Sequence, residues 1–401
     1  MKIGLSKTKN PSKFDFLLLA YLVLMAITSL FSIHAAFGLV GSSAGWGYFY
    51  KQLMWFIIGF IALSAIIYLG NDAMLDFAKI AYWILMGCLI YLFLSKILYM
   101  ITTHSLPFVQ EQTNGAISWF IFPGIGSFQP SEFMKIVLIL ITAGIIDKHN
   151  KNKITDSYEL DFTLFMNVAK WAIPPILLIF LQPDTGVVLI IAISLFAMII
   201  CSGIKRQWLI IIATLAVVSL ILFFYMYYNH FDTLNNLIGG AGGYKMKRIT
   251  SWLNPETDIN NTGHQLYTAL LAIGSAGFSG WGPGLELVAI PEAQTDFIFA
   301  VIGQSWGLIG TIFILLLCVG LDIHLCRIAS ASTNMFEKYF ILGVLGMLLY
   351  QQVQNIGMIV GLLPITGITL PLISYGGSSL LSYLATFGII MNASAKNKSK
   401  I

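Results

Sequence analysis

Ten long stretches of apolar residues run through this chain of 401 residues, and they restrict its fold more than any other feature. The hydrocarbon core of a bilayer is about 30 Å thick, so about 20 apolar residues in a helix can span it. Only 10% of the residues are charged, whereas a soluble domain carries about 25%. The composition therefore predicts an all-α polytopic membrane protein and excludes a water-soluble fold.

The predicted transmembrane helices number about ten and cover residues 14–38, 50–70, 77–100, 131–147, 163–182, 186–203, 207–229, 296–325, 338–361 and 372–392. The first apolar run is about 25 residues long, which exceeds the hydrophobic part of a signal peptide, so we expect it to remain as the first helix. The whole chain, residues 1–401, is expected to form a single membrane domain.

The basic residues between these helices predict the orientation of the chain, because cytoplasmic segments carry more Lys and Arg than outer segments. With the N-terminus inside, the cytoplasmic segments contain Lys2, Lys7, Lys9, Lys13, Lys148, Lys151, Lys153, Lys205, Arg206, Arg327, Lys338, Lys396, Lys398 and Lys400. The predicted outer loops at 100–130 and 361–372 contain neither Lys nor Arg. The pattern predicts two cytoplasmic termini and a large outer loop, residues 229–295, between spans seven and eight.

The cysteines and histidines give no sign of a metal or disulfide framework. The four cysteines lie in or beside apolar spans and form no CxxC pair: Cys88, Cys201, Cys318 and Cys326. The six histidines are scattered along the chain, and none is paired at metal-ligand spacing. These observations argue against a zinc site and against a disulfide-stabilised fold.

One carboxylate, Asp296, lies directly before the eighth apolar stretch, in the segment PEAQTDFIFAVIGQSWGLIG at 291–310. At about 100° per residue, the small residues that share the helix face of Asp296 are Ala300, Gly303, Gly307 and Gly310. A helix face without side chains indicates tight packing against a neighbour or, alternatively, a groove for a lipid tail.

A second polar group surrounds Glu132 and Lys135, which are three residues apart and share one helix face. Gln129, Pro130 and Ser131 indicate that this helix starts near the outer interface. Charged side chains at membrane depth are costly and usually mark function. The alternative is an ion pair that neutralises itself and fixes helix packing.

Two further polar groups lie in predicted outer segments. The turn between spans five and six contains Asp184, which by itself is most often a turn-forming residue. The basic cluster at 244–248 includes Lys247 and Arg248, and its outer position runs against the usual distribution of basic residues. The cluster indicates either an anionic partner, such as a diphosphate or lipid headgroup, or an interfacial helix anchored by Trp252.

The last two spans add amides and hydroxyls. Span nine carries too many amides to face lipid, so they are predicted to face the bundle interior: Gln351, Gln352, Gln354 and Asn355. The segment SYGGSS at 374–379 offers glycines for close backbone approach and hydroxyl donors at the outer face.

Taken in chain order, these motifs resemble the SEDS family of shape, elongation, division and sporulation proteins, the RodA, FtsW and SpoVE type. The matching residues are Gly115, Ala116, Trp119, Gln129, Pro130, Ser131, Glu132 and Lys135, the QPDTG turn at 182–186, most of 291–300, NIGM at 355–358 and SYGGS at 374–378. Single motifs of this kind are weak, but the ordered set is specific. The resemblance favours the RodA elongation type over the FtsW division type.

This resemblance implies an inverting peptidoglycan glycosyltransferase of the bacterial cytoplasmic membrane, which polymerises lipid II at the outer face for cell elongation and shape or for division. Asp296 is then the candidate base. The start of a helix would favour its carboxylate form, whereas nearby diphosphates would raise its pKa. The implied substrate-binding residues are Trp119, Glu132, Lys135, Asp184, Lys247, Arg248, Thr295, Ser374 and Ser378.

The resemblance also implies partners. These are lipid II, the glycan on undecaprenyl diphosphate, membrane lipids and a class B penicillin-binding protein with transpeptidase activity; no nucleic acid is expected. A divalent cation, Mg²⁺ or Mn²⁺, is a candidate for neutralising the diphosphate, although no residue is predicted as a metal ligand. Two other functions stay open: a lipid II flippase or transporter, and a non-catalytic scaffold for the penicillin-binding protein.

Several positions depart from the family pattern, including His264, Thr268 and Ala269, where relatives commonly have Tyr, Gln and Ser. Ser118 stands where many relatives have Arg, Gln294 where they have His, and Gln304 and Ser305 where they often have two Glu residues. A phosphate contact at Ser118 and acid chemistry at Gln304 and Ser305 are therefore not expected here.

Overall fold

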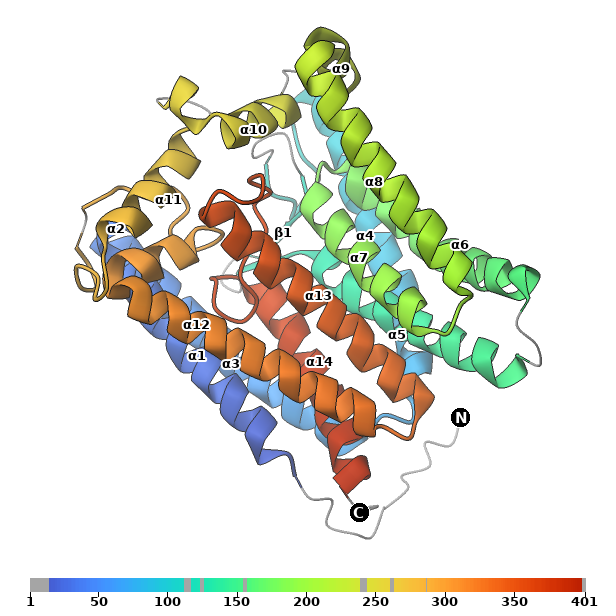
Figure 1. Cartoon of the computed structure of the whole chain (residues 1–401). Helices are drawn as coiled ribbons and strands as arrows, with labels where there is room; N and C mark the ends of the chain where they lie inside the picture. The colour runs from blue at the N-terminus through green and yellow to red at the C-terminus, as the bar shows by residue number, and fades with distance from the viewer. Residues whose placement is uncertain are drawn as a thin grey trace.

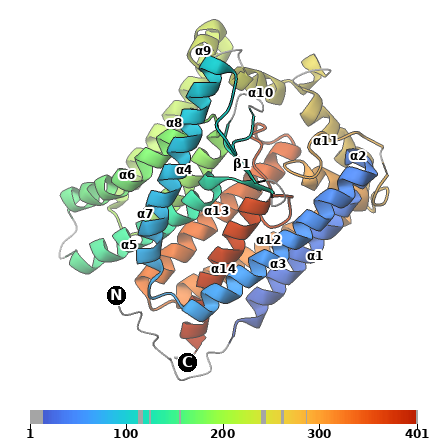
Figure 2. The same cartoon turned by 180° about the vertical axis from the view of Figure 1, so that it is seen from behind.

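The computed structural model of this chain describes residues 14–111, 117–122, 126–153, 157–238, 244–259, 263–285 and 287–398. Its long helices run side by side, and the shorter helices α9, α10 and α11 gather at one end of the bundle (Figures 1 and 2). Helix α1 begins and helix α14 ends at the opposite end (Figure 1). The start of the first long helix and the end of the last therefore lie on the same side, which is what an even number of spans produces. This agrees with the prediction that both termini lie on one side of the membrane.

Ten long helices account for the predicted apolar stretches, so the all-α fold is confirmed. They are α1 (Phe16–Ala35), α3 (Ser42–Leu69), α4 (Met74–Thr102), α5 (Pro130–Asn152), α6 (Tyr158–Leu181), α7 (Thr185–Cys201), α8 (Arg206–Asn229), α12 (Ile298–Ala331), α13 (Met335–Ile359) and α14 (Gly377–Lys398). Length and composition alone qualify six of the described helices as membrane-spanning: α1, α3, α4, α6, α8 and α12. Helix α7 is apolar but has only 17 residues, and α5, α13 and α14 carry polar side chains that the bundle buries.

The shorter elements connect these helices. They are α2 (Phe37–Val40), α9 (Phe231–Ile238), α10 (Tyr244–Leu253), the 3-10 helix η2 (Pro255–Asp258) and α11 (His264–Ser275). Strands β1 (Phe120–Phe122) and β2 (Gly126–Phe128) pair antiparallel, with Phe120 opposite Phe128. Strand β2 leads into α5, whose first residue is Pro130. The predicted helix start is confirmed, since proline lacks an N–H group and fits the first turn of a helix.

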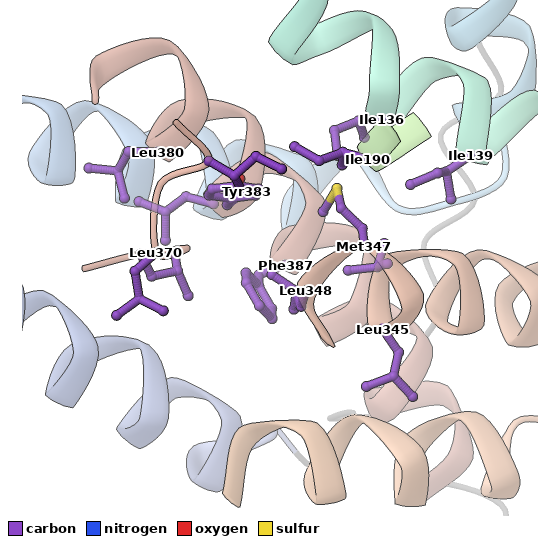
Figure 3. Packing of buried hydrophobic residues seen from close by; sticks show 14 of the residues in the cluster. Ile136, Ile139, Ile190, Leu345, Met347, Leu348, Leu370, Leu380, Tyr383 and Phe387 are labelled. Carbon is purple, nitrogen blue, oxygen red and sulfur yellow. The ribbon is translucent and has the colours of Figure 1, made fainter. Parts of the chain in front are cut away.

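The core lies where α5, α7, α13 and α14 meet, and Figure 3 shows apolar side chains from these helices packed together there. Ile136 of α5, Ile190 of α7, Met347 of α13 and Phe387 of α14 are all buried. Lipid tails are as apolar as these side chains, so close packing and polar contacts hold such helices together.

A buried ion pair adds polar contacts to this core. The Lys135 ammonium, which is fully buried, donates to Glu132 Oε2 over 2.7 Å and to the Tyr383 hydroxyl over 3.0 Å. Gln351 of α13 donates to the same hydroxyl over 2.7 Å. The pair therefore links α5 to α13 and α14. The other amides predicted to face the interior, Gln352, Gln354 and Asn355, are also buried, so that prediction is confirmed.

The small residues of α12 are covered by protein. A Cβ atom added to Gly303 would lie 2.8 Å from Ile273 of α11. Gly307, with φ +61° and ψ −150°, interrupts the helix, and its backbone lies against Phe278 and Gly280. The packing at Gly303 and Gly307 supports the interpretation that this face packs tightly against its neighbours, whereas half-buried Gly310 contacts only its own helix, so a lipid groove stays a prediction.

The Glu132–Lys135 pair predicts an unequal response to single and double substitution. Lys135→Met leaves a buried carboxylate without its cation, which costs about 3–5 kcal/mol. Adding Glu132→Gln removes that charge, so we expect the double variant to regain most of the lost Tm. Thermal unfolding in detergent measures both. Lys79→Met, which breaks the exposed Lys79–Asp76 pair, is the control and should change Tm little. Equal losses in the single and double variants would contradict this account.

The lysine pattern predicts which end of the bundle faces outward. In a variant without the four native cysteines, Lys247→Cys on α10 and Asn152→Cys at the end of α5 both place a thiol at an exposed position. A membrane-impermeant thiol reagent added outside the cell should label the first and not the second. The reversed result would place Asp296 at the cytoplasmic face.

Candidate functional site

Asp296 lies in the turn before α12, and one buried amide fixes this turn. Asn355 Nδ2 of α13 donates to the backbone carbonyl of Asp296 over 2.7 Å and to that of Ile368 over 2.8 Å. The Asp296 carboxylate therefore lies beside the loop that precedes α14. Gly367, with φ +75°, faces it: a Cβ atom there would lie 3.7 Å from Asp296 Oδ2.

Burial raises the pKa of the Asp296 carboxyl to about 6, and the charge of Glu292 adds to this effect. A hydrogen bond from Thr295 Oγ1 to Asp296 Oδ1, at 3.1 Å, and the charge of Arg248 act in the opposite direction. We expected the start of α12 to favour the carboxylate form of Asp296, but the Asp296 side chain does not cap this helix. The N-cap is Phe297, and no side chain caps this helix.

Helix α10 crosses the loop that lies next to Asp296. Arg248 Nη1 donates to the carbonyl of Ile365 over 3.3 Å, and Trp252 Nε1 donates to that of Gly361 over 3.0 Å. Arg248 is half-buried and close enough to Asp296 to affect its pKa. The side chain of Lys247 is exposed. The predicted basic cluster therefore places Arg248 at the site.

A second carboxylate, Asp184, lies on the other side of the same loop. Its Oδ1 caps α7 by accepting from the N–H of Val187 over 3.2 Å, and its Oδ2 accepts from Gln129 Nε2 over 2.7 Å. A Cβ atom added to the neighbouring Gly186 would lie 3.3 Å from Cγ1 of Ile368. Burial raises the pKa of Asp184 to about 6. Asp184 and Asp296 thus flank residues 366–368.

Glu132 and Lys135 lie next to Asp184, since their charges act on its pKa in opposite directions. The Lys135 ammonium points into the protein, toward Glu132 and the Tyr383 hydroxyl. This geometry gives the pair the packing role that was one of its two interpretations. A contact between Lys135 and a diphosphate stays a prediction.

The two predicted serines hold the loop and the start of α14. Ser374 Oγ accepts from the N–H of Leu370 over 2.9 Å and is buried. Ser378 Oγ accepts from the N–H of Gln129 over 3.0 Å and donates to the carbonyl of Ser127 over 3.2 Å. Ser378 therefore ties the start of α14 to that of α5, and both hydroxyls serve the architecture of the site.

Trp119 and Ser118 lie farther from Asp296. Trp119 is half-buried beside β1, and its carbonyl accepts from the N–H of Gln110 over 3.0 Å. Ser118 is buried and donates to the carbonyl of Gln182 over 3.3 Å. The short side chain of Ser118 therefore holds the turn before Asp184.

Three positions that shape the site were not predicted as site residues. Gln129 was interpreted as part of a helix start and of the family motif, although its side chain holds Asp184. Buried Gln52 of α3 donates to the carbonyl of Ser374 over 3.2 Å and accepts from the N–H of Gly376 over 3.3 Å. Glu292 accepts from Thr295 Oγ1 over 3.2 Å. Gln52 could have been predicted as a site residue because it is a polar residue within an apolar stretch.

The donor set does not fit a closed metal site. Among the residues that the structure describes, no three side chains of His, Cys, Asp or Glu gather at metal-binding distance. Mg²⁺ is often bound by one or two carboxylates together with substrate phosphates. A divalent cation that arrives with a diphosphate therefore stays a proposal, and no chemical step below depends on it.

Two comparisons with solved structures show the same fold. One is the structure of a peptidoglycan synthase complex that coordinates polymerization and crosslinking. A chain of that complex aligns with a TM-score of 0.71 and 23% sequence identity, and the alignment covers 96% of this chain and 98% of that chain. The rod shape determining protein RodA of Thermus thermophilus gives a TM-score of 0.62 and 24% identity, covering 95% and 97%.

Sequence comparisons establish the family. Stage V sporulation protein E of Bacillus subtilis is 34% identical over 297 residues, 72% of this chain and 74% of that protein. The probable peptidoglycan glycosyltransferase FtsW of Geobacter sulfurreducens is 29% identical over 405 residues, 99% of each chain. These relatives bear sporulation and division names, so the elongation type stays a prediction. Because the model of the FtsW, RodA and SpoVE family, described as cell cycle proteins, matches residues 12–399, this chain belongs to that family, the SEDS proteins.

Proposed function

We propose that this chain is a peptidoglycan glycosyltransferase of the bacterial cytoplasmic membrane that polymerises lipid II at the outer face. One observation carries the proposal: a half-buried carboxylate, Asp296, lies directly before α12 and beside the cationic Arg248 of α10, and its pKa is about 6. The glycosyltransferase name of the FtsW relative supports it.

Asp296 is the base of the proposed reaction. A hydroxyl of the acceptor sugar attacks the anomeric carbon of the growing chain, the diphosphate leaves from the opposite side, and the configuration inverts. Asp296 takes the hydroxyl proton as the new bond forms. A base works best when its pKa lies near the operating pH, and burial brings Asp296 closer to that range than an ordinary carboxylate, which has a pKa of 3.8.

The leaving diphosphate requires positive charge. Arg248, half-buried next to Asp296, is the group that the fold places there, and guanidinium groups bind phosphate oxygens in a bidentate manner. Lys247 is exposed on the same helix, where it can meet the diphosphate or lipid headgroups at the membrane surface. A divalent cation bound to the diphosphate would add to this charge.

The partner in the proposal is a class B penicillin-binding protein that crosslinks the new strands. The solved peptidoglycan synthase complex, which contains a chain with the same fold, supports such an assembly because that complex coordinates polymerization and crosslinking. The substrates are lipid II and the growing glycan on undecaprenyl diphosphate.

Asp296→Asn tests the base directly. Asn keeps the size of the side chain but cannot take up the proton, and general-base help is worth about 10²–10⁴ in rate. We expect purified Asp296→Asn to bind lipid II and to lose polymerisation by about this factor. Asp322→Asn, which changes another buried carboxylate of α12, is the matched control and should stay active. A transporter or a scaffold predicts normal function with Asn, and full polymerase activity of this variant would exclude Asp296 as the base.

The raised pKa of Asp296 predicts the pH dependence of the rate. Only the carboxylate form accepts a proton, so the initial rate at saturating lipid II should fall as the pH drops through about 6. Arg248 lowers this pKa, so Arg248→Gln should move the midpoint to higher pH. Initial rates between about pH 5 and 8 measure both midpoints. A rate that does not fall between about pH 8 and 5, or a midpoint that Arg248→Gln does not change, would contradict the assignment.

A further inference from the structure

A single hydroxyl lies between two carboxylates at the site. Thr295 Oγ1 is 3.1 Å from Asp296 Oδ1 and 3.2 Å from Glu292 Oε2. It is also 3.2 Å from the backbone carbonyl of Glu292. A threonine hydroxyl has one proton to donate and two lone pairs with which to accept. It can therefore donate to one carboxylate while it accepts from the other acid group when that group is protonated.

The two carboxylates differ in their contact with water. Glu292 is exposed, whereas Asp296 is half-buried beside Gly367. The turn itself directs Glu292 back toward Thr295. Glu292 has φ +50°, in the left-handed region, and its carbonyl accepts from the N–H of Thr295 over 3.0 Å. Gln294 Nε2, which cannot titrate, lies 3.5 Å from the same Glu292 oxygen.

The proposed reaction needs an exit for protons. Each transfer leaves the proton of the acceptor hydroxyl on Asp296, and the diphosphate departs without taking it. Asp296 must return to its carboxylate form before the next sugar is added. While a growing chain occupies the open side of the site, a route through protein groups to the exposed Glu292 serves this purpose.

We propose that Thr295 and Glu292 form a proton relay that restores Asp296 after each transfer, a proposal that rests on the proposed function. The O–H bond of protonated Asp296 breaks, after a half-turn of the carboxyl group if the proton was taken up on Oδ2, and an O–H bond forms on Thr295 Oγ1. The original O–H bond of Thr295 breaks, and its proton forms an O–H bond on Glu292 Oε2. Water then takes this proton, and no group is oxidised or reduced.

The relay is tested by removing the hydroxyl and supplying another proton acceptor. Thr295→Val keeps the shape of the side chain, and we expect the rate at saturating lipid II to fall about 10- to 100-fold, with unchanged lipid II binding. Imidazole added to the buffer should restore the rate, because a small base can take the proton from Asp296 directly. Glu292→Gln should behave in the same way, and Thr295→Ser should regain the rate to within a few-fold.

The control matches the substitution. Thr311 Oγ1 of α12 donates to a backbone carbonyl three residues earlier, that of Leu308, over 3.0 Å. Thr311→Val therefore removes a similar local hydrogen bond away from the two carboxylates. We expect this variant to keep the rate of the unsubstituted protein, both with and without imidazole. Measuring all variants at pH 8 keeps Asp296 in its carboxylate form, so an altered pKa does not imitate the effect.

The outcomes are distinct. Full activity of Thr295→Val, or a slow variant that imidazole does not restore, would overturn the relay and leave the polymerase proposal intact. Weakened lipid II binding by Thr295→Val would assign the hydroxyl to substrate contact instead, which also overturns the relay. Absence of polymer from the unsubstituted protein would overturn the proposed function and the relay together.

Discussion

The site depends on one amide nitrogen. Asn355 is fully buried in α13, and its Nδ2 donates both to the carbonyl before α12 and to the carbonyl of Ile368 before α14. The bond to the Ile368 carbonyl is buried and the bond to the Asp296 carbonyl is part-buried, and leaving a buried acceptor unsatisfied costs about 1–3 kcal/mol. A single side chain therefore joins two segments that lie far apart in the sequence and places the 366–368 loop beside Asp296.

Small residues make this close arrangement possible. Gly367 adopts a φ of +75° next to the Asp296 carboxylate, and Gly186 packs against Ile368 from the side of Asp184. A Cβ atom at position 186 would crowd Ile368, and a side chain at position 367 would strain the backbone, whose φ there is positive. The loop can lie between Asp184 and Asp296 because these two positions are glycines. Hydrogen bonds of three further side chains hold the residues around this loop: those of Gln129, Gln52 and Ser378.

Much of the fold could be predicted from the sequence because long apolar runs in a bilayer have almost no alternative to helices. Pro130 fixed the start of α5, and the crowd of amides in α13 had to face inward. The partners of those amides could not be predicted. Asn355 bonds to groups 59 and 13 residues away, and helical periodicity gives a direction but no distant partner.

The site itself was predicted in part. Asp296 was predicted as a carboxylate before a helix and Asp184 as a carboxylate in a turn, but only the structure shows that they flank one loop. Neighbours in a helix differ by about 100° in direction, which is why the basic cluster brings half-buried Arg248 to the site and leaves Lys247 exposed. The direction of the Lys135 side chain was equally undetermined, because a pair three residues apart can face a cavity or a neighbouring helix. In the structure its ammonium donates to the Tyr383 hydroxyl, so the side chain faces α14.

The central claim is that this arrangement polymerises lipid II, and the most direct measurement is the product formed by the purified protein. Fluorescent lipid II is incubated with the unsubstituted chain in detergent or liposomes, alone and with its transpeptidase partner, and the products are separated by length. The account predicts glycan strands that lengthen with time and disappear on digestion with a muramidase. Lipid II that remains unchanged in both preparations, while the protein still folds and binds it, would contradict the account.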